Sequence, residues 1–83
     1  MGRSSYYLVF GLSNCPFCKE ADNLLGSLGY DYEYFTLDND PEYLLEMKEF
    51  YKHRTVPIVL KVGEDSVVRF IGGCDDLKRE LND

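Results

Sequence analysis

The sequence predicts an α/β domain with the element order β-α-β-α-β-β-α, a four-stranded mixed sheet and helices on both faces of the sheet. Three observations predict this class. Residues 6–11, 16–28 and 31–37 form a strand, a helix and a strand, which implies a right-handed parallel crossover. Residues 58–62 and 66–71 form two strands close enough for an antiparallel hairpin. The 83 residues contain no linker or repeat, so we expect one domain over 1–83.

The N-terminal half contains the first three elements. Residues 6–11 are aromatic, aliphatic or small, which is typical of a strand buried on both faces. A helix from Pro16 to about Leu28 follows, with Gly29 as a plausible C-cap. Its expected buried stripe consists of Phe17, Ala21, Leu24, Leu25 and Leu28. In the next strand Glu33, Phe35 and Leu37 alternate with Tyr32, Tyr34 and Thr36.

The C-terminal half continues with a helix, a hairpin and a short final helix. Asp40 is the expected N-cap and Pro41 the first residue of a helix that ends near Tyr51. We expect the hairpin loop at 63–65 and the end of the hairpin at 72–73. Asp75 and Asp76 then begin the last helix, where acidic residues suit the helix dipole. The expected buried face of the second helix consists of Leu44, Met47, Phe50 and Tyr51.

The most informative local motif is Cys15-Pro16-Phe17-Cys18, which lies where the first strand leads into the first helix. Pro16 suits the first helical position, which makes Cys15 the N-cap and puts Cys18 one turn further along. The free N–H groups of a helix start favour negative charge, so we expect the Phe17 and Cys18 amides to hydrogen-bond a Cys15 thiolate. The motif therefore predicts Cys15 as the attacking thiolate and Cys18 as the thiol that resolves the mixed disulfide.

The paired cysteines also fit a metal site or a purely structural role. A Cys-x-x-Cys pair is half of a zinc site, and a structural zinc site needs four ligands. The remaining candidates, Cys74 and His53, stand alone and far apart in the sequence. The cysteines could also be inert residues of the core. We expect a redox dithiol and no metal site.

Composition and charge argue against several classes of partner. The formal net charge is −6, which argues against a nucleic-acid partner and mildly against small anionic substrates. The longest uncharged run, which begins at Ser4, is too polar to span a bilayer, and the first residues do not resemble a signal peptide. Three cysteines are an odd number, which argues against a secreted disulfide framework. We therefore expect a cytoplasmic protein without membrane contact.

The element order and three motifs together give the chain a resemblance to dithiol glutaredoxins of the thioredoxin-like superfamily, and to short bacterial or phage members in particular. The motifs are Cys15-Pro16-Phe17-Cys18, Thr55-Val56-Pro57 and Gly72-Gly73-Cys74-Asp75-Asp76, and the resemblance extends from Tyr6 to Leu81. It implies a glutathione-dependent thiol–disulfide oxidoreductase that reduces protein disulfides and glutathione mixed disulfides.

The resemblance also implies a groove for glutathione, which would be a co-substrate and not a tightly bound cofactor. In the family the proline matching Pro57 is cis and packs against the dithiol, which leaves the backbone of Val56 free to pair with a peptide. The Cys74 and Asp75 amides would hold the γ-glutamyl carboxylate. An aspartate side chain would hold the ammonium group, with Asp75 as the first choice and Asp76 as the second. Arg54 would attract the glycine carboxylate. The full expected set is Phe17, Arg54, Thr55, Val56, Pro57, Gly73, Cys74, Asp75 and Asp76.

Each of these residues could equally have an ordinary structural role. Pro57 would simply start a strand, and the two glycines before Cys74 would form a turn followed by acidic caps. Arg54 would be a solvated surface residue and Phe17 the first residue of the buried stripe. Cys74 would be a small buried hydrophobic residue or a regulatory thiol.

One departure from the family pattern affects glutathione binding. The family usually has a lysine three residues before the first cysteine, and this chain has Leu12. We therefore expect weaker glutathione binding, unless Lys52, His53 and Arg54 compensate for the missing lysine. The protein could instead prefer protein disulfides as substrates. The alternatives are an electron carrier recharged by thioredoxin reductase and an iron–sulfur or metal-binding protein. We expect a monomer. Its expected partners are glutathione and disulfide-containing or glutathionylated proteins, with ribonucleotide reductase as a candidate.

Overall fold

The strands form a single mixed sheet in the computed structural model, which describes residues 4–82. The elements are β1 (Tyr6–Gly11), α1 (Pro16–Ser27), β2 (Tyr32–Thr36), α2 (Pro41–Tyr51), β3 (Ile58–Val62), β4 (Val68–Gly72) and α3 (Cys74–Asn82). The strand order across the sheet is β2-β1-β3-β4. β1 runs parallel to β2 and antiparallel to β3, and β3 runs antiparallel to β4. The predicted element order and mixed sheet are confirmed.

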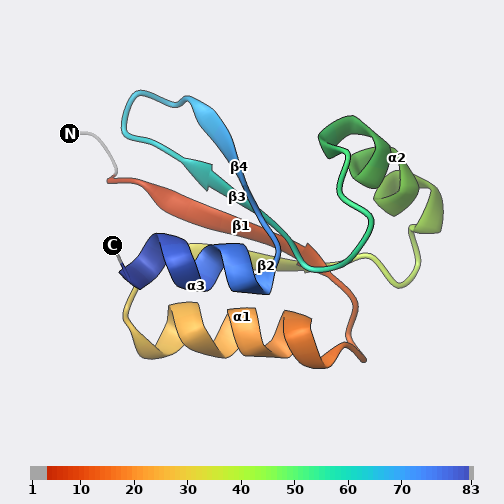
Figure 1. The fold of residues 1–83 in the computed structure, drawn as a ribbon, viewed down its shortest axis with the longest axis horizontal. Coiled ribbons are helices and arrows are strands. Elements are labelled where there is room, and N and C mark those ends of the chain that lie inside the picture. The colour runs from red at the N-terminus through yellow and green to blue at the C-terminus, as the bar shows by residue number, and fades with distance from the viewer. Residues whose placement is uncertain (1–3, 83) are drawn as a thin grey trace.

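Helices cover both faces of this sheet, as predicted. Figure 1 shows α1 and α3 side by side on one face and α2 on the other. On the α1/α3 face the buried cluster consists of Tyr7, Val9, Ala21, Leu25, Val59, Cys74 and Leu77. On the α2 face it consists of Phe10, Leu37, Leu44, Met47, Ile58 and Leu60. Because successive strand residues point to opposite faces, β1 and β3 contribute to both clusters. Each fully buried aliphatic side chain contributes about 1.5–3 kcal/mol.

The ends of α1 follow from local sequence. Cys15 is the N-cap and Pro16 occupies the first helical position. At the other end Gly29 has a φ of +78°. The Gly29 and Tyr30 amides donate to the Gly26 and Leu25 carbonyls at 3.2 and 3.1 Å, which are the two bonds of a Schellman motif. Gly29 therefore follows the C-cap instead of forming it. Within the described residues, no helix is long and apolar enough to cross a membrane.

Three residues expected in the core are exposed. Phe17 and Phe50 are 60% and 77% exposed, and Leu28 is also exposed. Phe17 lies on the first turn of α1, and Leu28 lies just beyond its last turn, so neither packs under the sheet. Next to Phe50, Tyr51 takes the inward position and stacks on Phe70 with ring centroids 4.9 Å apart.

Two local predictions also differ from the structure. The hairpin turn extends past 65, since Ser66 has a φ of +68° and the Val67 amide donates to Asp65 Oδ1 at 3.0 Å. The strand predicted from Ser66 therefore begins at Val68. Asp40 is the N-cap of α2, but its side chain makes no cap hydrogen bond, because its backbone lies outside the β region usual at that position.

Candidate active site: a dithiol beside a surface groove

The Cys15 sulfur lies at the N-terminus of α1, as predicted. The Cys18 amide donates to Cys15 Sγ at 3.2 Å, and the Lys19 amide donates to the Cys15 carbonyl at 3.0 Å. The Phe17 and Cys18 amides were both expected to bond this sulfur, and within residues 4–82 only the Cys18 amide does so. Cys15 keeps 8% of its surface exposed, and Cys18 keeps none. All three cysteines are free thiols. Both cysteines are buried, and Cys15 is the more accessible member of the pair.

The environment of Cys18 favours the protonated thiol. Burial raises its pKa to about 11, and its hydrogen bond with Cys15 adds to the effect. The Leu12 backbone and the Tyr34 hydroxyl, which can both donate to a thiolate, act in the opposite direction and lower this pKa. Cys18 therefore keeps its proton at neutral pH, which suits a thiol that acts second.

A glycine at the end of β1 makes room for the Cys18 sulfur. A Cβ atom at Gly11 would lie 2.6 Å from Cys18 Sγ and 2.8 Å from the Tyr34 hydroxyl. Real Cβ atoms do not approach other atoms so closely, so any other residue here would displace the thiol, the Tyr34 hydroxyl or the end of β1. Tyr34 reaches this point from β2, and its hydroxyl donates to the Leu12 carbonyl at 2.9 Å. Neither residue was predicted from the sequence, since only the pairing of β1 with β2 brings them to the thiol.

A groove of about 300 Å³ lies beside the dithiol motif. Figure 1 shows that the starts of α1 and α3 lie at the same end of the molecule as the loop before β3. Every predicted groove residue except Arg54 lines the hollow. The lining residues are Phe17, His53, Thr55, Val56, Pro57, Gly73, Cys74, Asp75 and Asp76. Phe17 belongs to the same tetrapeptide as Cys15, so the groove adjoins the reactive sulfur. The Val56–Pro57 bond is cis, as in the resembled family.

His53, and not Arg54, contributes the basic side chain of the groove. Arg54 lines a different hollow, next to α2. Neighbouring side chains outside a helix project to different sides, which sequence alone does not resolve. The His53 ring lies 3.2 Å from Thr55 Oγ1 through Nε2 and packs edge-on against Phe70 at 5.5 Å. A Cβ at Gly73 would lie 3.3 Å from the same nitrogen, so glycine lets the ring close over the groove.

The start of α3 presents amides and a carboxylate to the groove. Asp76 Oδ2 accepts from the Gly73 amide at 3.0 Å, and Asp76 also pairs with Arg79. Asp75 is exposed, and within residues 4–82 its carboxylate makes no hydrogen bond or ion pair. The amides of the first turn lack helical partners and carry the positive end of the dipole. This end of the groove therefore suits a group that carries both a carboxylate and an ammonium.

Cys74 is a buried thiol that lies in both the core and the groove wall. Burial raises the pKa of its thiol, and the charge of Glu20 raises it further. Lys78 opposes this effect and forms an ion pair with Glu20. The Cys74 sulfur is therefore poorly suited to nucleophilic attack, which agrees with the prediction of a small buried residue.

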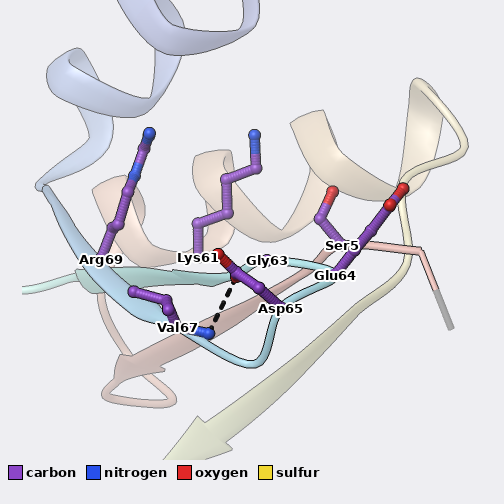
Figure 2. A pocket seen from close by; sticks show the side chains of 7 residues that line it. All are labelled: Ser5, Lys61, Gly63, Glu64, Asp65, Val67 and Arg69. Carbon is purple, nitrogen blue, oxygen red and sulfur yellow. Dashed lines mark hydrogen bonds between the residues drawn. The ribbon is translucent and has the colours of Figure 1, made fainter. Parts of the chain in front are cut away.

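A larger hollow of about 520 Å³ lies at the β3–β4 hairpin. Figure 2 shows Lys61 and Arg69 extending from its floor on the same side. Both cations pair with Glu80, at 3.5 and 3.2 Å, and no thiol lines the hollow. Across residues 4–82, no three His, Cys, Asp or Glu side chains gather in a group that could hold a metal ion. The dithiol and its groove are thus the candidate site.

Comparison with known proteins supports a family assignment. The Glutaredoxin family profile matches residues 7–67. Glutaredoxin-C4, chloroplastic, of rice (Oryza sativa subsp. japonica) is 36% identical in an alignment of 76 positions that covers 88% of this chain and 53% of the rice protein. The chain therefore spans about half the length of that relative. The narrower likeness to short bacterial or phage members stays a prediction.

Two crystal structures of glutaredoxins have the same fold as this chain. Wheat glutaredoxin is 33% identical with a TM-score of 0.79, over 92% of this chain and 68% of the wheat chain. A buckwheat glutaredoxin–glutathione complex is 26% identical with a TM-score of 0.80, over 94% of this chain and 69% of the buckwheat chain. The chain therefore belongs to the glutaredoxin family and has its thioredoxin-like fold.

Proposed function

We propose that the chain is a glutathione-dependent thiol–disulfide oxidoreductase that reduces protein disulfides and glutathione mixed disulfides through Cys15 and Cys18. One observation carries the proposal: the more accessible sulfur of the pair, at a helix N-terminus, adjoins a groove whose far end suits an amino-acid zwitterion. The buckwheat relative was crystallised as a glutathione complex, which supports the choice of ligand. We propose a monomer that works in the cytoplasm.

Reduction of a protein disulfide takes two exchanges on this chain. The Cys15 thiolate attacks one sulfur of the substrate, the substrate S–S bond breaks, and the released thiolate takes up a proton. Cys18 then loses its proton and attacks the Cys15 sulfur, which releases the second substrate thiol and leaves a Cys15–Cys18 disulfide. The greater burial of Cys18 fits this order, because it acts on an adjacent sulfur and never meets the substrate.

Two glutathione molecules restore the dithiol. The first attacks Cys15, so that Cys18 leaves as a thiol and Cys15 carries glutathione. The second attacks the glutathione sulfur of that mixed disulfide, which frees Cys15 and forms glutathione disulfide. The net reaction converts a protein disulfide and two glutathiones into a protein dithiol and one glutathione disulfide. Removal of glutathione from a glutathionylated protein needs only Cys15.

The groove supplies contacts for each part of glutathione. The Cys74 and Asp75 amides receive the γ-glutamyl carboxylate, and the free Asp75 carboxylate receives the ammonium. The Val56 backbone pairs with the main chain of the tripeptide. Since Leu12 is apolar and Arg54 lines another hollow, the glycine carboxylate is assigned to His53.

The catalytic roles are tested by glutathione-coupled assays on a protein disulfide and on a glutathionylated peptide. Cys15→Ser should abolish both activities. Cys18→Ser should lose reduction of the protein disulfide and keep removal of glutathione. Loss of both activities in Cys18→Ser would overturn the assigned roles. Recharging by thioredoxin reductase in place of glutathione would favour the carrier function instead.

The groove assignment has a matched pair of neighbouring variants. His53→Gln should raise the KM for glutathione severalfold, because it removes the imidazole from the groove wall. Arg54→Gln, one residue away and outside the groove, should leave this KM unchanged. The reverse result would restore the original role of Arg54.

A further inference from the structure

The Tyr34 hydroxyl lies between the segment before Cys15 and the resolving thiol. Tyr34 pairs with Val9 in the β1–β2 register, which brings its ring to the end of β1. Its hydroxyl donates to the Leu12 carbonyl at 2.9 Å. The site of the absent Gly11 Cβ lies 2.8 Å from this hydroxyl and 2.6 Å from Cys18 Sγ. The hydroxyl and the thiol therefore both lie over the bare backbone of Gly11, and Tyr34 is one of the groups that act on the pKa of Cys18.

We propose that Tyr34 is a positioning residue for Cys18: its hydroxyl holds the protonated thiol and then donates to the thiolate that resolves the mixed disulfide. This inference rests on the function proposed above. A hydroxyl has one hydrogen and two acceptor lone pairs. Once Cys15 carries glutathione, the S–H of the protonated Cys18 donates to the Tyr34 oxygen and the phenol O–H donates to Leu12. When Cys18 loses its proton, the O–H turns from the Leu12 carbonyl to the sulfur.

The charges around the two groups favour this direction of donation. The hydrogen bond with Tyr34 lowers the pKa of Cys18, against the larger effect of burial. Burial raises the pKa of the Tyr34 phenol, and the neighbouring Cys18, Cys15 and Asp22 raise it further. Tyr34 thus keeps its proton throughout and serves as a donor, not as a base.

The step that Tyr34 assists is the closure of the Cys15–Cys18 disulfide. In the glutathione mixed disulfide, Cys18 first gives its proton to the solvent. The Cys18 thiolate then attacks Cys15 Sγ, the bond from that sulfur to glutathione breaks, and the glutathione thiolate takes up a proton. A donor beside Cys18 increases the fraction of thiolate available for attack. No such donor is needed when Cys15 alone is used.

Tyr34→Phe removes only the hydroxyl and should slow closure while the Cys15-only reaction continues. For each unit by which the pKa of Cys18 rises, the thiolate fraction falls tenfold and its nucleophilicity partly recovers, so closure slows about three- to fourfold. Tyr32→Phe is the matched control, because Tyr32 lies on the same strand and donates to Asp22 Oδ1 at 2.5 Å instead.

The experiment charges the reduced protein with one equivalent of glutathione disulfide and follows release of glutathione across pH 6–10 by rapid quench. We expect slower closure in Tyr34→Phe and a profile displaced to higher pH, with Tyr32→Phe like wild type. In a Cys18→Ser background, Tyr34→Phe should leave removal of glutathione unchanged. Equal closure rates in Tyr34→Phe and wild type would overturn the proposal, as would equal slowing of both pathways, which would mean that the hydroxyl only anchors Leu12.

A second variant keeps the proposal testable if Tyr34→Phe does not fold. Incorporation of 3-fluorotyrosine at position 34 keeps the ring and makes the hydroxyl a stronger donor. Closure should then accelerate and its profile move to lower pH; an unchanged profile would refute the role. The wild-type measurement separates this result from the function itself, because a wild-type protein that never closes its dithiol contradicts the proposed function and not Tyr34.

Discussion

Gly11→Ala tests whether the Cys18 sulfur is held as tightly as the structure indicates. The added methyl carbon would lie 2.6 Å from Cys18 Sγ, 2.8 Å from the Tyr34 hydroxyl and 3.0 Å from Cys18 Cβ. Cys18 is fully buried, so its sulfur has no free solvent space to move into. The methyl group therefore has to displace the thiol, the tyrosine or the end of β1.

The cost can be worked from these contacts. Overpacking of a buried site typically costs about 1–3 kcal/mol. Replacing a glycine also reduces the entropy of the unfolded chain, which returns about 0.4–1 kcal/mol. A net loss of about 1–2 kcal/mol lowers the Tm of a domain of this size by about 4–16 °C.

Thermal unfolding followed by circular dichroism measures the effect, with Gly26→Ala as the control. Gly26 lies in α1 and is exposed, and its added methyl carbon would meet only the Tyr32 side chain, with the hydroxyl nearest at 3.2 Å. An alanine inside a helix gains about 0.5–1 kcal/mol over glycine, so Gly26→Ala should keep or raise the Tm. A Gly11→Ala protein that melts at or above the wild-type temperature would show that the thiol is not confined.

Three further predictions concern charge and capping. Because the pKa of Cys18 is raised from 9.0 to about 11 in the fold, the stability it contributes is present below pH 9 and lost as pH rises through about 11. Between pH 8 and 11, the free energy of unfolding measured in urea should therefore fall more in wild type than in Cys18→Ala. Equal losses in the two proteins would contradict this prediction. Asp76→Ala removes the carboxylate cap of α3 and should cost about 0.5–2 kcal/mol in urea unfolding. Asp75→Asn should stay within about 0.5 kcal/mol of wild type, and the opposite ranking would reverse the two roles. Glu20→Gln should lower the pKa of Cys74 and speed its alkylation at pH 8–9, measured in a chain whose other two cysteines are replaced. An unchanged rate would show that the charge of Glu20 does not act on this thiol.

Local rules were enough to predict the reactive junction. Pro16 suits a helix start, and this alone makes Cys15 an N-cap beside free amides. Gly29 ends the same helix because a φ of +78° costs a glycine little. These features depend on backbone groups within about one turn of each other, so the sequence determined the element order, the N-cap position of Cys15 and the place of Cys18 one turn further along.

The tertiary structure decided which side chains meet at that junction. The groove joins residues 17, 53–57 and 73–76, and packing of α1 and α3 on one sheet face brings these segments together. The tertiary structure also places His53 in the groove wall and Arg54 in a different hollow. The pairing of β1 with β2 set the Tyr34 hydroxyl and the Cys18 sulfur against Gly11. Such contacts depend on strand register and side-chain direction, which residues distant in sequence determine jointly.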